Sequence, residues 1–389
     1  MKTLAKARLL VTRFPYRSQW GGEELHTLTL VKELDKKGVP SFYLGSCPVL
    51  GKAFKEAHFD VKWARLGKPP VTKFWLLAFT MLSPLLFVKA GLLLWRARRR
   101  WGVTAVLMLS LGEKLLMTPW AHFFGMRTLW IEHARIGRWI TKNPWRGVYR
   151  WCSRWATVVV TSNAMVGYVR PLISERGVSP RLAPISCAVM VEKASELRPD
   201  LLKFLSGAGG VKQPEWTSPF VVSTVARLTP DKGVDMLVHL VHSKPEVRLV
   251  VVGEGPLKKA LENKADLSRV RFVNSLPRGE LMELYKRSDL FVLASREMDP
   301  FGMVAAEAMH FGTPVLLTNV CGIAADLVHS RDAWIVEPRV AELDKAFKRL
   351  QKDPVLRAAL GKHGQAFVKS HYRLDSMVGE FEGLLAMRK

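Results

Sequence analysis

Several residue patterns that define common protein classes are missing from this 389-residue sequence. Its four cysteines form no C-x-x-C pair, which argues against a disulfide scaffold or a cysteine zinc site and favours a reducing compartment. No G-x-x-x-x-G-K-[ST] loop occurs, so a P-loop phosphate site is excluded. The first apolar run is too short for the core of a signal peptide, and we expect none.

Acidic residues are scarce in the first half of the chain, and this gives the two halves different electrostatic character. Residues 1–195 contain 31 basic and 10 acidic residues, whereas the remaining 194 contain 28 and 24. Most of the formal net charge of +25 therefore belongs to the first half. A strongly cationic region implies a polyanionic partner, which leaves nucleic acid, an anionic membrane face and a phosphorylated substrate as candidates.

An apolar segment, Phe74–Trp95, lies inside the most basic part of the sequence. It begins with 15 uncharged residues, but Lys89 interrupts it and Pro84 is expected to kink it, whereas a spanning helix needs about 20 apolar residues in a row. Residues 62–154 hold 17 basic and two acidic residues, with tryptophans interleaved. We predict that this region docks on an anionic membrane interface. The membrane-binding residues would be Arg96, Arg98, Arg99 and Arg100. A buried helix pair with a solvated basic face, or a spanning helix, are the alternatives.

Short apolar runs alternate with helix-like stretches in both halves of the chain, which is the pattern of parallel α/β sheets. The clearest runs are Ala7–Val11, Thr104–Met108, Thr157–Thr161, Phe220–Val225, Leu249–Val252 and Leu290–Leu293. A polar, glycine-rich stretch separates the two sets. We predict a basic first domain over residues 1–191, a linker over 192–218 and a second domain over 219–370.

Two motifs in the second half combine charge, glycine and a helix start. In RLTPDKG, residues 227–233, Arg227 and Lys232 flank a turn and can converge on one anion, such as a diphosphate. In SREMDPFGMVAAEAM, residues 295–309, Asp299 precedes a helix that starts near Gly302, and Glu307 lies about two turns into that helix. The strand and glycine turn that follow place another loop at the same sheet edge, where ligands bind. The alternatives are a solvated turn and an ordinary capped helix.

The first half offers weaker signals. In WGGEE, Gly22 lies at a strand-to-helix turn, where glycine permits close approach by a phosphate or a sugar. In LWIEHAR, His133 directly follows a predicted strand, although an isolated histidine is often structural.

Together these motifs resemble the retaining glycosyltransferases of family 4, also called group 1, which have the GT-B fold. VARLTPDKGVDMLV, LVVVGEGPLKKAL, LYKRSDLFVLAS and DPFGMVAAEAMHFGTPVLLTNVCGIAADLV occur in the family's order between Phe220 and Val328. GGEE, IEHAR and TVVVTSNAM match in the first half. The resemblance implies two Rossmann-like parallel-sheet α/β domains that face each other across a cleft and close on the donor. The first would bind the acceptor, the second would bind a nucleotide-sugar, and residues 371–389 would cross back to the first.

The resemblance also implies roles for individual residues. Arg227 and Lys232 would hold the donor diphosphate, and Glu307 would accept hydrogen bonds from the nucleotide ribose. His133 and Asp299 would be the catalytic residues beside the transferred sugar. The other donor contacts would be Gly22 at the diphosphate, Leu276 in the loop under the base, and the backbone N–H groups of Phe301, Gly302 and Met303.

Two positions depart from the family pattern. Asp299 stands where the family usually has glutamate, which shortens the side chain by one methylene and bears on sugar preference. Ile185–Val189 replaces the usual Asn-Gly-Val-Asp turn before the interdomain hinge, which bears on the geometry of that hinge.

The implied reaction retains the anomeric configuration, with the departing phosphate taking the proton of the attacking hydroxyl. No D-x-D pair occurs, so we expect no metal and no cofactor, and Arg227, Lys232 and the helix end at Gly302 would replace the metal. The expected partners are a nucleotide-sugar, a lipid-linked or anionic cell-envelope glycan such as a lipopolysaccharide or polysaccharide precursor, and an anionic membrane. The expected location is cytoplasmic, peripheral on the inner face of the cell membrane.

Other interpretations stay open. The chain could be a catalytically inactive GT-B relative that acts as a membrane scaffold, or a related epimerase or phosphorylase. A basic nucleic-acid-binding protein would fit the charge, but no helix-turn-helix, RNA or zinc signature supports it, and we expect no nucleic acid. A nicotinamide enzyme fits poorly, because Lys258 occupies the third glycine position after Gly253-x-Gly255.

Overall fold

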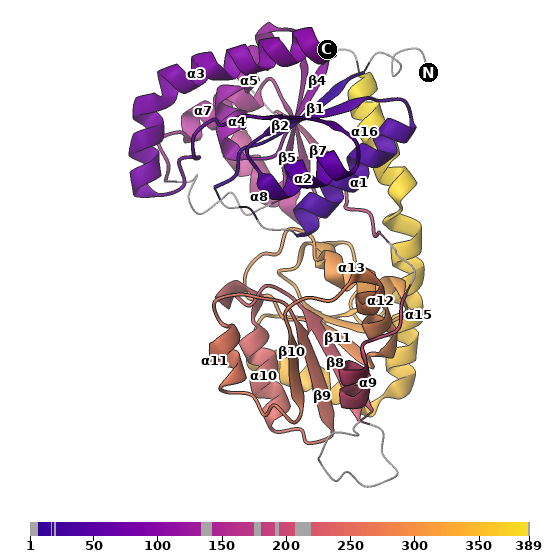
Figure 1. Cartoon of the computed structure of the whole chain (residues 1–389). Coiled ribbons are helices and arrows are strands. Elements are labelled where there is room, and N and C mark those ends of the chain that lie inside the picture. Colours follow the sequence, from indigo (N-terminus) through magenta and orange to yellow (C-terminus); the bar gives the residue numbers. More distant parts are fainter. Residues whose placement is uncertain are drawn as a thin grey trace. The chain divides into compact units, whose positions relative to one another are not determined.

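The structure is a computed structural model that describes residues 7–16, 18, 21–133, 142–174, 180–190, 194–206 and 219–387. Contacts between residues divide the chain into two compact units (Figure 1). Unit 1 consists of Met1–Cys187 together with Asp375–Lys389, and unit 2 consists of Ala188–Leu374.

Unit 1 is built on a seven-stranded parallel sheet with the order β3-β2-β1-β4-β5-β6-β7. Its strands are β1 (Leu9–Arg13), β2 (Ser41–Gly45), β3 (Asp60–Trp63), β4 (Ala105–Met108), β5 (Arg127–Glu132), β6 (Thr157–Val160) and β7 (Arg181–Pro184). Leu9 on the central β1 pairs with Ser41 on one side and Ala105 on the other. The strand order reverses between β1 and β4, which is the position where α/β sheets of this kind open a crevice for ligands.

Helices surround this sheet (Figure 1). They are α1 (Gly22–Lys36), α2 (Pro48–Glu56), α3 (Lys73–Trp101), α4 (Leu111–Leu116), α5 (Thr118–Phe123), α7 (Arg146–Ser153), α8 (Asn163–Ile173) and α16 (Leu374–Ala386). α16 belongs to unit 1 from Asp375 on, so the last helix packs on the first unit.

The apolar segment found in the sequence forms one helix of 29 residues, α3. The Thr72 hydroxyl caps its start by accepting from the Trp75 N–H at 3.3 Å, and Gly102 ends it with a left-handed φ of 63°. The helix continues through Pro84, which lacks an N–H for the carbonyl of Thr80. The Ser83 hydroxyl donates to that carbonyl at 2.8 Å and so satisfies it.

Unit 2 is built on a six-stranded parallel sheet with the order β10-β9-β8-β11-β12-β13. Its strands are β8 (Phe220–Val225), β9 (Val247–Val252), β10 (Val270–Val273), β11 (Leu290–Leu293), β12 (Val315–Thr318) and β13 (Trp334–Val336). Its helical segments are α9 (Pro199–Leu205), η2 (Pro230–Lys232), α10 (Val234–His242), α11 (Lys258–Glu262), α12 (Arg278–Arg287), α13 (Met303–His310), η3 (Gly322–Ala325), α14 (Val340–Lys352) and α15 (Pro354–His371).

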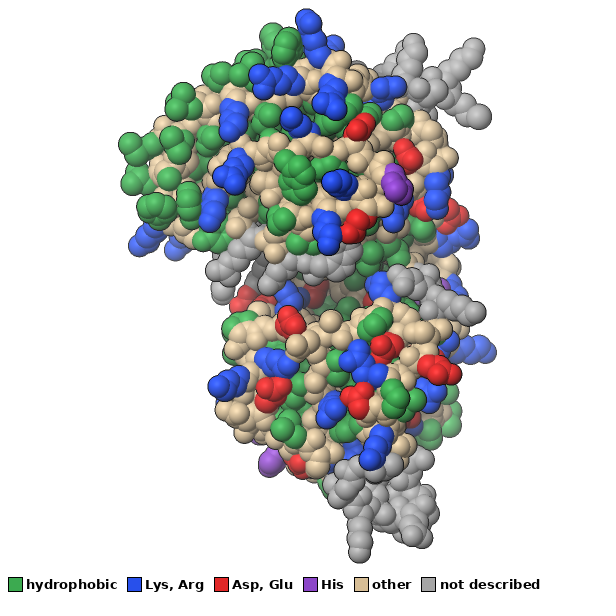
Figure 2. All heavy atoms as spheres, viewed as in Figure 1, with side chains coloured by type: hydrophobic (Ala, Val, Ile, Leu, Met, Phe, Trp, Pro, Cys, Tyr) green, Lys and Arg blue, Asp and Glu red, His purple; other side chains and the backbone are tan. Residues whose placement is uncertain are grey.

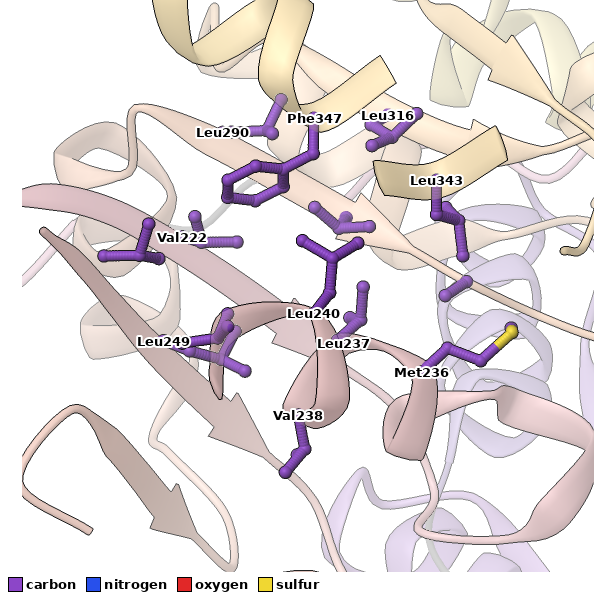
Figure 3. Packing of buried hydrophobic residues seen from close by; sticks show 14 of the residues in the cluster. Val222, Met236, Leu237, Val238, Leu240, Leu249, Leu290, Leu316, Leu343 and Phe347 are labelled. Carbon is purple, nitrogen blue, oxygen red and sulfur yellow. The ribbon is translucent and has the colours of Figure 1, made fainter. Parts of the chain in front are cut away.

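The core of unit 2 lies between its sheet and the helices α10 and α14 (Figure 3). Leu237 and Leu240 of α10 pack with Leu249 of β9 and Phe347 of α14, and each of the four is at most 3% exposed. Burial of each such side chain contributes about 1.5–3 kcal/mol. The alternating apolar runs read from the sequence are therefore the buried strands of two parallel sheets.

The unit boundaries differ in detail from the sequence-based domains. The chain leaves unit 1 at Cys187, inside the unusual Ile185–Val189 segment, and returns at Asp375. The predicted linker over residues 192–218 contains the helix α9, which belongs to unit 2. Arg198 before α9 binds Glu280 of α12 at 3.0 Å, so this segment is attached to unit 2 rather than free of it. Residues 207–218 lie outside the described residues.

Candidate functional site

Three loops at the carboxyl ends of neighbouring strands carry the motifs of unit 2. They follow β8, β11 and β12 and comprise Arg227–Gly233, Ser295–Gly302 and Asn319–Gly322. The Arg296 N–H donates to the Asp231 carbonyl at 2.8 Å, and the Gly322 N–H donates to the Asp299 carbonyl at 2.7 Å. The three loops therefore form one surface at a single sheet edge, as the strand and glycine pattern predicted.

Glycine is required at two turns of this surface. Gly233 has a φ of 63°, and a Cβ added there would lie 2.1 Å from the Ala294 carbonyl oxygen. Gly302 has a φ of 95° and precedes the first residue of α13. The first N–H groups of a helix have no acceptor within the helix, so the start of α13 is suited to an anion.

Lys232 and Asp299, both predicted site residues, are brought together and paired with each other. Lys232 Nζ lies 2.6 Å from Asp299 Oδ2, and the two side chains are 12% and 16% exposed. The pair is thus partly open to solvent. A ligand with several negative charges can compete with Asp299 for the ammonium group of Lys232.

The other predicted donor contacts are placed as follows. Arg227 is exposed at the end of β8, and Leu276 is half-buried in the loop between β10 and α12. The Phe301 N–H donates to Asp299 Oδ1 at 3.4 Å, while the Phe301 ring is buried and contacts Tyr372. Gly302 and Met303 form the start of α13.

Glu307 is buried on α13, with only 3% of its surface exposed, and it is bound by two side chains of α12. Arg278 Nη2 donates to Glu307 Oε1 at 3.0 Å, and the Tyr285 hydroxyl donates to Oε2 at 3.2 Å. Burial and the neighbouring Glu307 raise the pKa of Tyr285 well above its ordinary value, so the phenol remains a donor. Neither partner had a role predicted from the sequence.

In unit 1, Gly22 is the first residue of α1, and a buried arginine fixes that helix end. Arg13, the last residue of β1, binds Glu23 at 2.6 Å and Glu24 at 2.7 Å. Burial alone would lower the pKa of Arg13, but the two carboxylates outweigh it and raise the pKa. Arg13 therefore joins the central strand to the glycine turn that contains Gly22.

His133 follows β5, and its buried side chain belongs to a series of contacts that also includes His26 and Met377. Its Nε2 lies 3.1 Å from His26 Nδ1, and His26 Nε2 lies 3.1 Å from Met377 Sδ on α16. The Nδ1 atom of His133 is 3.7 Å from Glu23 Oε1, which places it near the turn at Gly22. Burial lowers the pKa of both histidines to about 3, so both are neutral near pH 7. The eight residues after His133 lie outside the described part of the chain.

A second buried network holds the end of β5 in place. Lys114 Nζ lies 2.6 Å from Glu132 Oε1 and donates to the Ile131 carbonyl at 2.8 Å. The Tyr149 hydroxyl donates to the same Glu132 oxygen at 2.7 Å. Because Glu132 directly precedes His133, this network sets the position of His133. This network was not predicted, because its members are far apart in the sequence.

The surface around α3 combines exposed apolar side chains with cations (Figure 2). A stripe with helical spacing is 42–74% exposed and consists of Phe74, Leu77, Met81, Leu85, Val88, Leu92 and Trp95. We call these seven residues the α3 stripe. Within the described residues α3 is the one helix long and apolar enough to cross a membrane, by length and composition. Its exposure argues against the buried helix pair considered from the sequence.

Within residues 61–133 and 142–174 of unit 1, no acidic side chain is exposed. Glu113 and Glu132 are the acidic residues there, and they are 0% and 3% exposed. Glu113 is used internally, because its Oε1 accepts from the Ser110 N–H at 2.6 Å, and burial raises its pKa to about 7. The surface cations of these two ranges therefore have no exposed acidic residue among them.

The four predicted membrane-binding arginines lie in the last turns of α3. Arg99 lies over the Trp95 ring at 4.9 Å, and Arg100 lies over the Trp101 ring at 5.6 Å. Arg98 donates to the Phe124 carbonyl at 2.5 Å. The contacts of Arg98, Arg99 and Arg100 hold three guanidinium groups at one end of the α3 stripe. Among the described residues, no group of three or more histidine, cysteine or acidic side chains could hold a metal ion.

Comparison with known sequences finds matches over part of the chain. Residues 211–367 match the family described as glycosyl transferases group 1. Over 189 residues the chain is 32% identical to a glycogen synthase of Mycobacterium tuberculosis, covering 44% of this chain and 45% of that protein. Over 174 residues it is 29% identical to a GDP-mannose-dependent monoacylated alpha-(1-6)-phosphatidylinositol monomannoside mannosyltransferase of Corynebacterium glutamicum, covering 41% and 45%. The matched region thus spans less than half the length of these relatives.

Comparison with solved structures finds matches over nearly the whole chain. Anabaena HepE in complex with UDP matches with a TM-score of 0.76 and 18% identity, covering 98% of this chain and 99% of that one. Sucrose-phosphate synthase of Thermosynechococcus elongatus matches with a TM-score of 0.74 and 18% identity, covering 97% and 98%. WaaG, a glycosyltransferase involved in lipopolysaccharide biosynthesis, matches with a TM-score of 0.65 and 16% identity, covering 97% and 99%. The chain therefore has the GT-B fold of glycosyltransferases, and residues 211–367 match glycosyl transferases group 1.

Proposed function

We propose that the protein is a retaining, metal-independent glycosyltransferase of family 4 that moves a sugar from a UDP- or GDP-sugar to a lipid-linked or other cell-envelope glycan. The observation that carries this proposal is the surface formed by three strand-end loops in unit 2. It joins Lys232, Asp299 and the start of α13 in the region that matches glycosyl transferases group 1. UDP and UDP-glucose are bound by the structural relative HepE, which supports a nucleotide-sugar donor here.

The ion pair between Lys232 and Asp299 suggests how the donor binds. The diphosphate carries more negative charge than one carboxylate, so Lys232 would exchange Asp299 for the phosphates, with Arg227 as the second cation. Asp299 would then be released toward the hydroxyls of the sugar. The start of α13 would add backbone N–H groups to the anion. Glu307 would receive the ribose, and Leu276 would lie beneath the base.

The reaction would proceed by breaking the bond between the anomeric carbon and the diphosphate oxygen, which keeps the electron pair. The acceptor hydroxyl would bond to that carbon from the same face, and its proton would pass to the departing phosphate. Arg227 and Lys232 would stabilise the charge that develops on the leaving group. His133 is neutral and near Gly22, which suits a contact with the sugar rather than a charged role.

The acceptor side of the proposal rests on the surface of unit 1. The α3 stripe would insert its apolar side chains at the level of the lipid head groups, and Arg96, Arg98, Arg99 and Arg100 would bind anionic lipids. The protein would then lie in the cytoplasm, peripheral on the inner face of the membrane, and a lipid-linked or anionic glycan would be the acceptor. The Corynebacterium relative is named for a phosphatidylinositol mannoside, which supports a lipid acceptor.

A catalytically inactive GT-B relative that acts as a membrane scaffold is the second candidate. One observation favours it, because the cation expected to bind phosphate is already paired with Asp299. A nucleic-acid-binding protein would use the same surface cations but would leave the exposed α3 stripe without a purpose, so we expect no nucleic acid.

A donor panel separates these candidates. Purified protein is offered UDP-, GDP-, ADP- and CMP-sugars with membrane lipid extract, and nucleotide release is measured. We expect release from one donor, and we expect Glu307→Ala to abolish it while Arg287→Ala, on the exposed side of α12, retains it. If no donor is turned over and no donor raises the Tm, the scaffold is favoured and the transferase proposal is wrong.

A further inference from the structure

Helix α12 contributes two side chains to one carboxylate of α13, and neither has a role in the proposed donor contacts. The two helices lie next to each other (Figure 1). Arg278 and Tyr285 are seven residues apart, which is two helical turns and places them on the same face of α12. They reach different oxygens of Glu307, at 3.0 Å and 3.2 Å.

This arrangement neutralises a charge that would be costly to bury. Glu307 is 3% exposed, and a buried carboxylate without a cation would be strongly destabilising. Arg278 supplies the positive charge, and its own side chain is 22% exposed. Tyr285 is completely buried and keeps its proton, so it supplies a neutral donor. The pair therefore stabilises Glu307 in its charged, accepting form.

The arrangement also fixes the orientation of the carboxylate plane. One donor on each oxygen restrains rotation about the last bond of the Glu307 side chain. Arg278 is itself restrained, because its Nη2 also donates to the Met190 carbonyl at 2.7 Å, near the start of unit 2. Both bonds come from one nitrogen of a planar guanidinium group, whose fixed N–H directions hold the geometry better than a lysine would.

We propose that Arg278 and Tyr285 are positioning residues that present the two oxygens of Glu307 to the two hydroxyl groups of a ribose. A carboxylate can accept about four hydrogen bonds, and Arg278 and Tyr285 each supply one of them. A ribose diol needs two acceptors at a fixed separation, and one carboxylate with a fixed plane provides them. This inference rests on the proposed nucleotide-sugar site, because Glu307 would meet the ribose there.

The experiment compares ligands with and without the ribose hydroxyls. Calorimetry measures the Kd of wild-type protein for UDP, GDP and ADP, and then for the 2′,3′-dideoxy form of the nucleotide that binds. The variants are Arg278→Ala and Tyr285→Phe, which keeps the buried ring. The matched control is Arg287→Ala, which removes an arginine of the same helix that is 51% exposed and bound to Glu283.

We expect Arg278→Ala to weaken binding of the ribonucleotide about tenfold and Tyr285→Phe about threefold, as for a charged and a neutral hydrogen bond. Neither variant should change the Kd of the dideoxynucleotide, and Arg287→Ala should change neither Kd. Equal losses with both ligands would mean that α12 only supports the fold, and this would overturn the inference. A wild-type protein that binds none of the three nucleotides would overturn the donor site itself. If Arg278→Ala does not fold, the Tyr285→Phe comparison decides the question in the same way.

Discussion

The two units share one architecture but place their charged groups differently. In unit 1 the two acidic residues of the region around α3 are buried, and the arginines at the end of α3 are exposed. In unit 2 the pair of Lys232 and Asp299 lies in the strand-end loops and is partly open to solvent. The parallel sheets are the same kind of scaffold in both units, so the side chains at loops and helix faces distinguish the proposed lipid-binding surface from the proposed nucleotide site.

The exposure of the ion pairs shows the same difference. Lys114 and Glu132 in unit 1 are 3% and 4% exposed, and they hold a strand end. Lys232 and Asp299 in unit 2 are 12% and 16% exposed at the same kind of strand end. A fully buried pair cannot exchange partners without leaving a charge unpaired, whereas a partly open pair can. We therefore assign a structural role to the first pair and a ligand-binding role to the second.

The largest expected effect is on the open pair of unit 2. Lys232→Ala should lower donor turnover about a thousandfold, because the cation expected at the leaving diphosphate is lost. The matched control is Lys348→Ala, since Lys348 is also 2.6 Å from an aspartate but is 61% exposed. Nucleotide release is the readout. Equal turnover by the two variants would show that the open pair has no part in the reaction.

The arginines of unit 1 should matter for membranes and not for the donor. Replacing Arg96, Arg98, Arg99 and Arg100 with serine should weaken binding to phosphatidylglycerol vesicles several hundredfold at low salt, at about 1 kcal/mol for each cation. High salt should remove the difference. Vesicle co-sedimentation measures this, alongside donor hydrolysis. Parallel loss of both activities would mean that the arginines serve folding.

The α3 stripe tests the apolar part of the same surface. The triple variant Leu77→Ser, Met81→Ser and Leu85→Ser should weaken vesicle binding about a hundredfold, at about 1 kcal/mol for each partly inserted side chain. Unlike the loss from the arginine variant, this loss should persist in high salt. Val355→Ser in unit 2, at a side chain that is 78% exposed, is the control and should bind as wild type does. Undiminished binding by the triple variant would contradict insertion of the stripe.

The smallest expected effect is a pH dependence of stability that belongs to unit 1. His26 and His133 have folded-state pKa values of about 3, below the ordinary unfolded value of about 6.5, so the unfolded chain binds protons first as the pH falls. Each histidine should therefore lower the stability by about 1.4 kcal/mol per pH unit between pH 6.5 and pH 5. Glu113, whose folded-state pKa is raised to about 7, takes up a proton first in the folded chain and offsets part of this loss. Urea unfolding followed by tryptophan fluorescence reports mainly unit 1, which contains 11 of the 13 tryptophans. His26→Gln should reduce the slope, and an unchanged slope would refute the assignment.

Much of the fold and part of the site followed from local sequence. Runs such as Phe220–Val225 are continuous and apolar because both faces of a parallel strand are buried, and the glycine turns after them mark the strand ends. Arg227, Lys232 and Asp299 could be named because they lie in those turns. The stripe on α3 was also visible as an apolar segment, but its exposure was not, since the same composition suits a buried helix.

The remaining features depend on tertiary packing. Tyr285 was part of a matched motif, but its contact with Glu307 depends on how α12 packs against α13. His26 and Met377 are 351 residues apart, and no local signal joins them. The sequence predicted a kink at Pro84, but it did not predict that the Ser83 hydroxyl replaces the lost backbone donor. Long-range contacts of this kind have no periodicity to read in a single sequence.

The central claim is that unit 2 binds the nucleotide and unit 1 binds the membrane. Hydrogen–deuterium exchange of the wild-type protein tests it most directly, with a nucleoside diphosphate in one experiment and phosphatidylglycerol vesicles in another. The account predicts that the nucleotide protects residues 227–233 and 299–307, and that the vesicles protect residues 73–101. Protection of unit 2 by vesicles, or no protection of either strand-end loop by any of UDP, GDP and ADP, would contradict it.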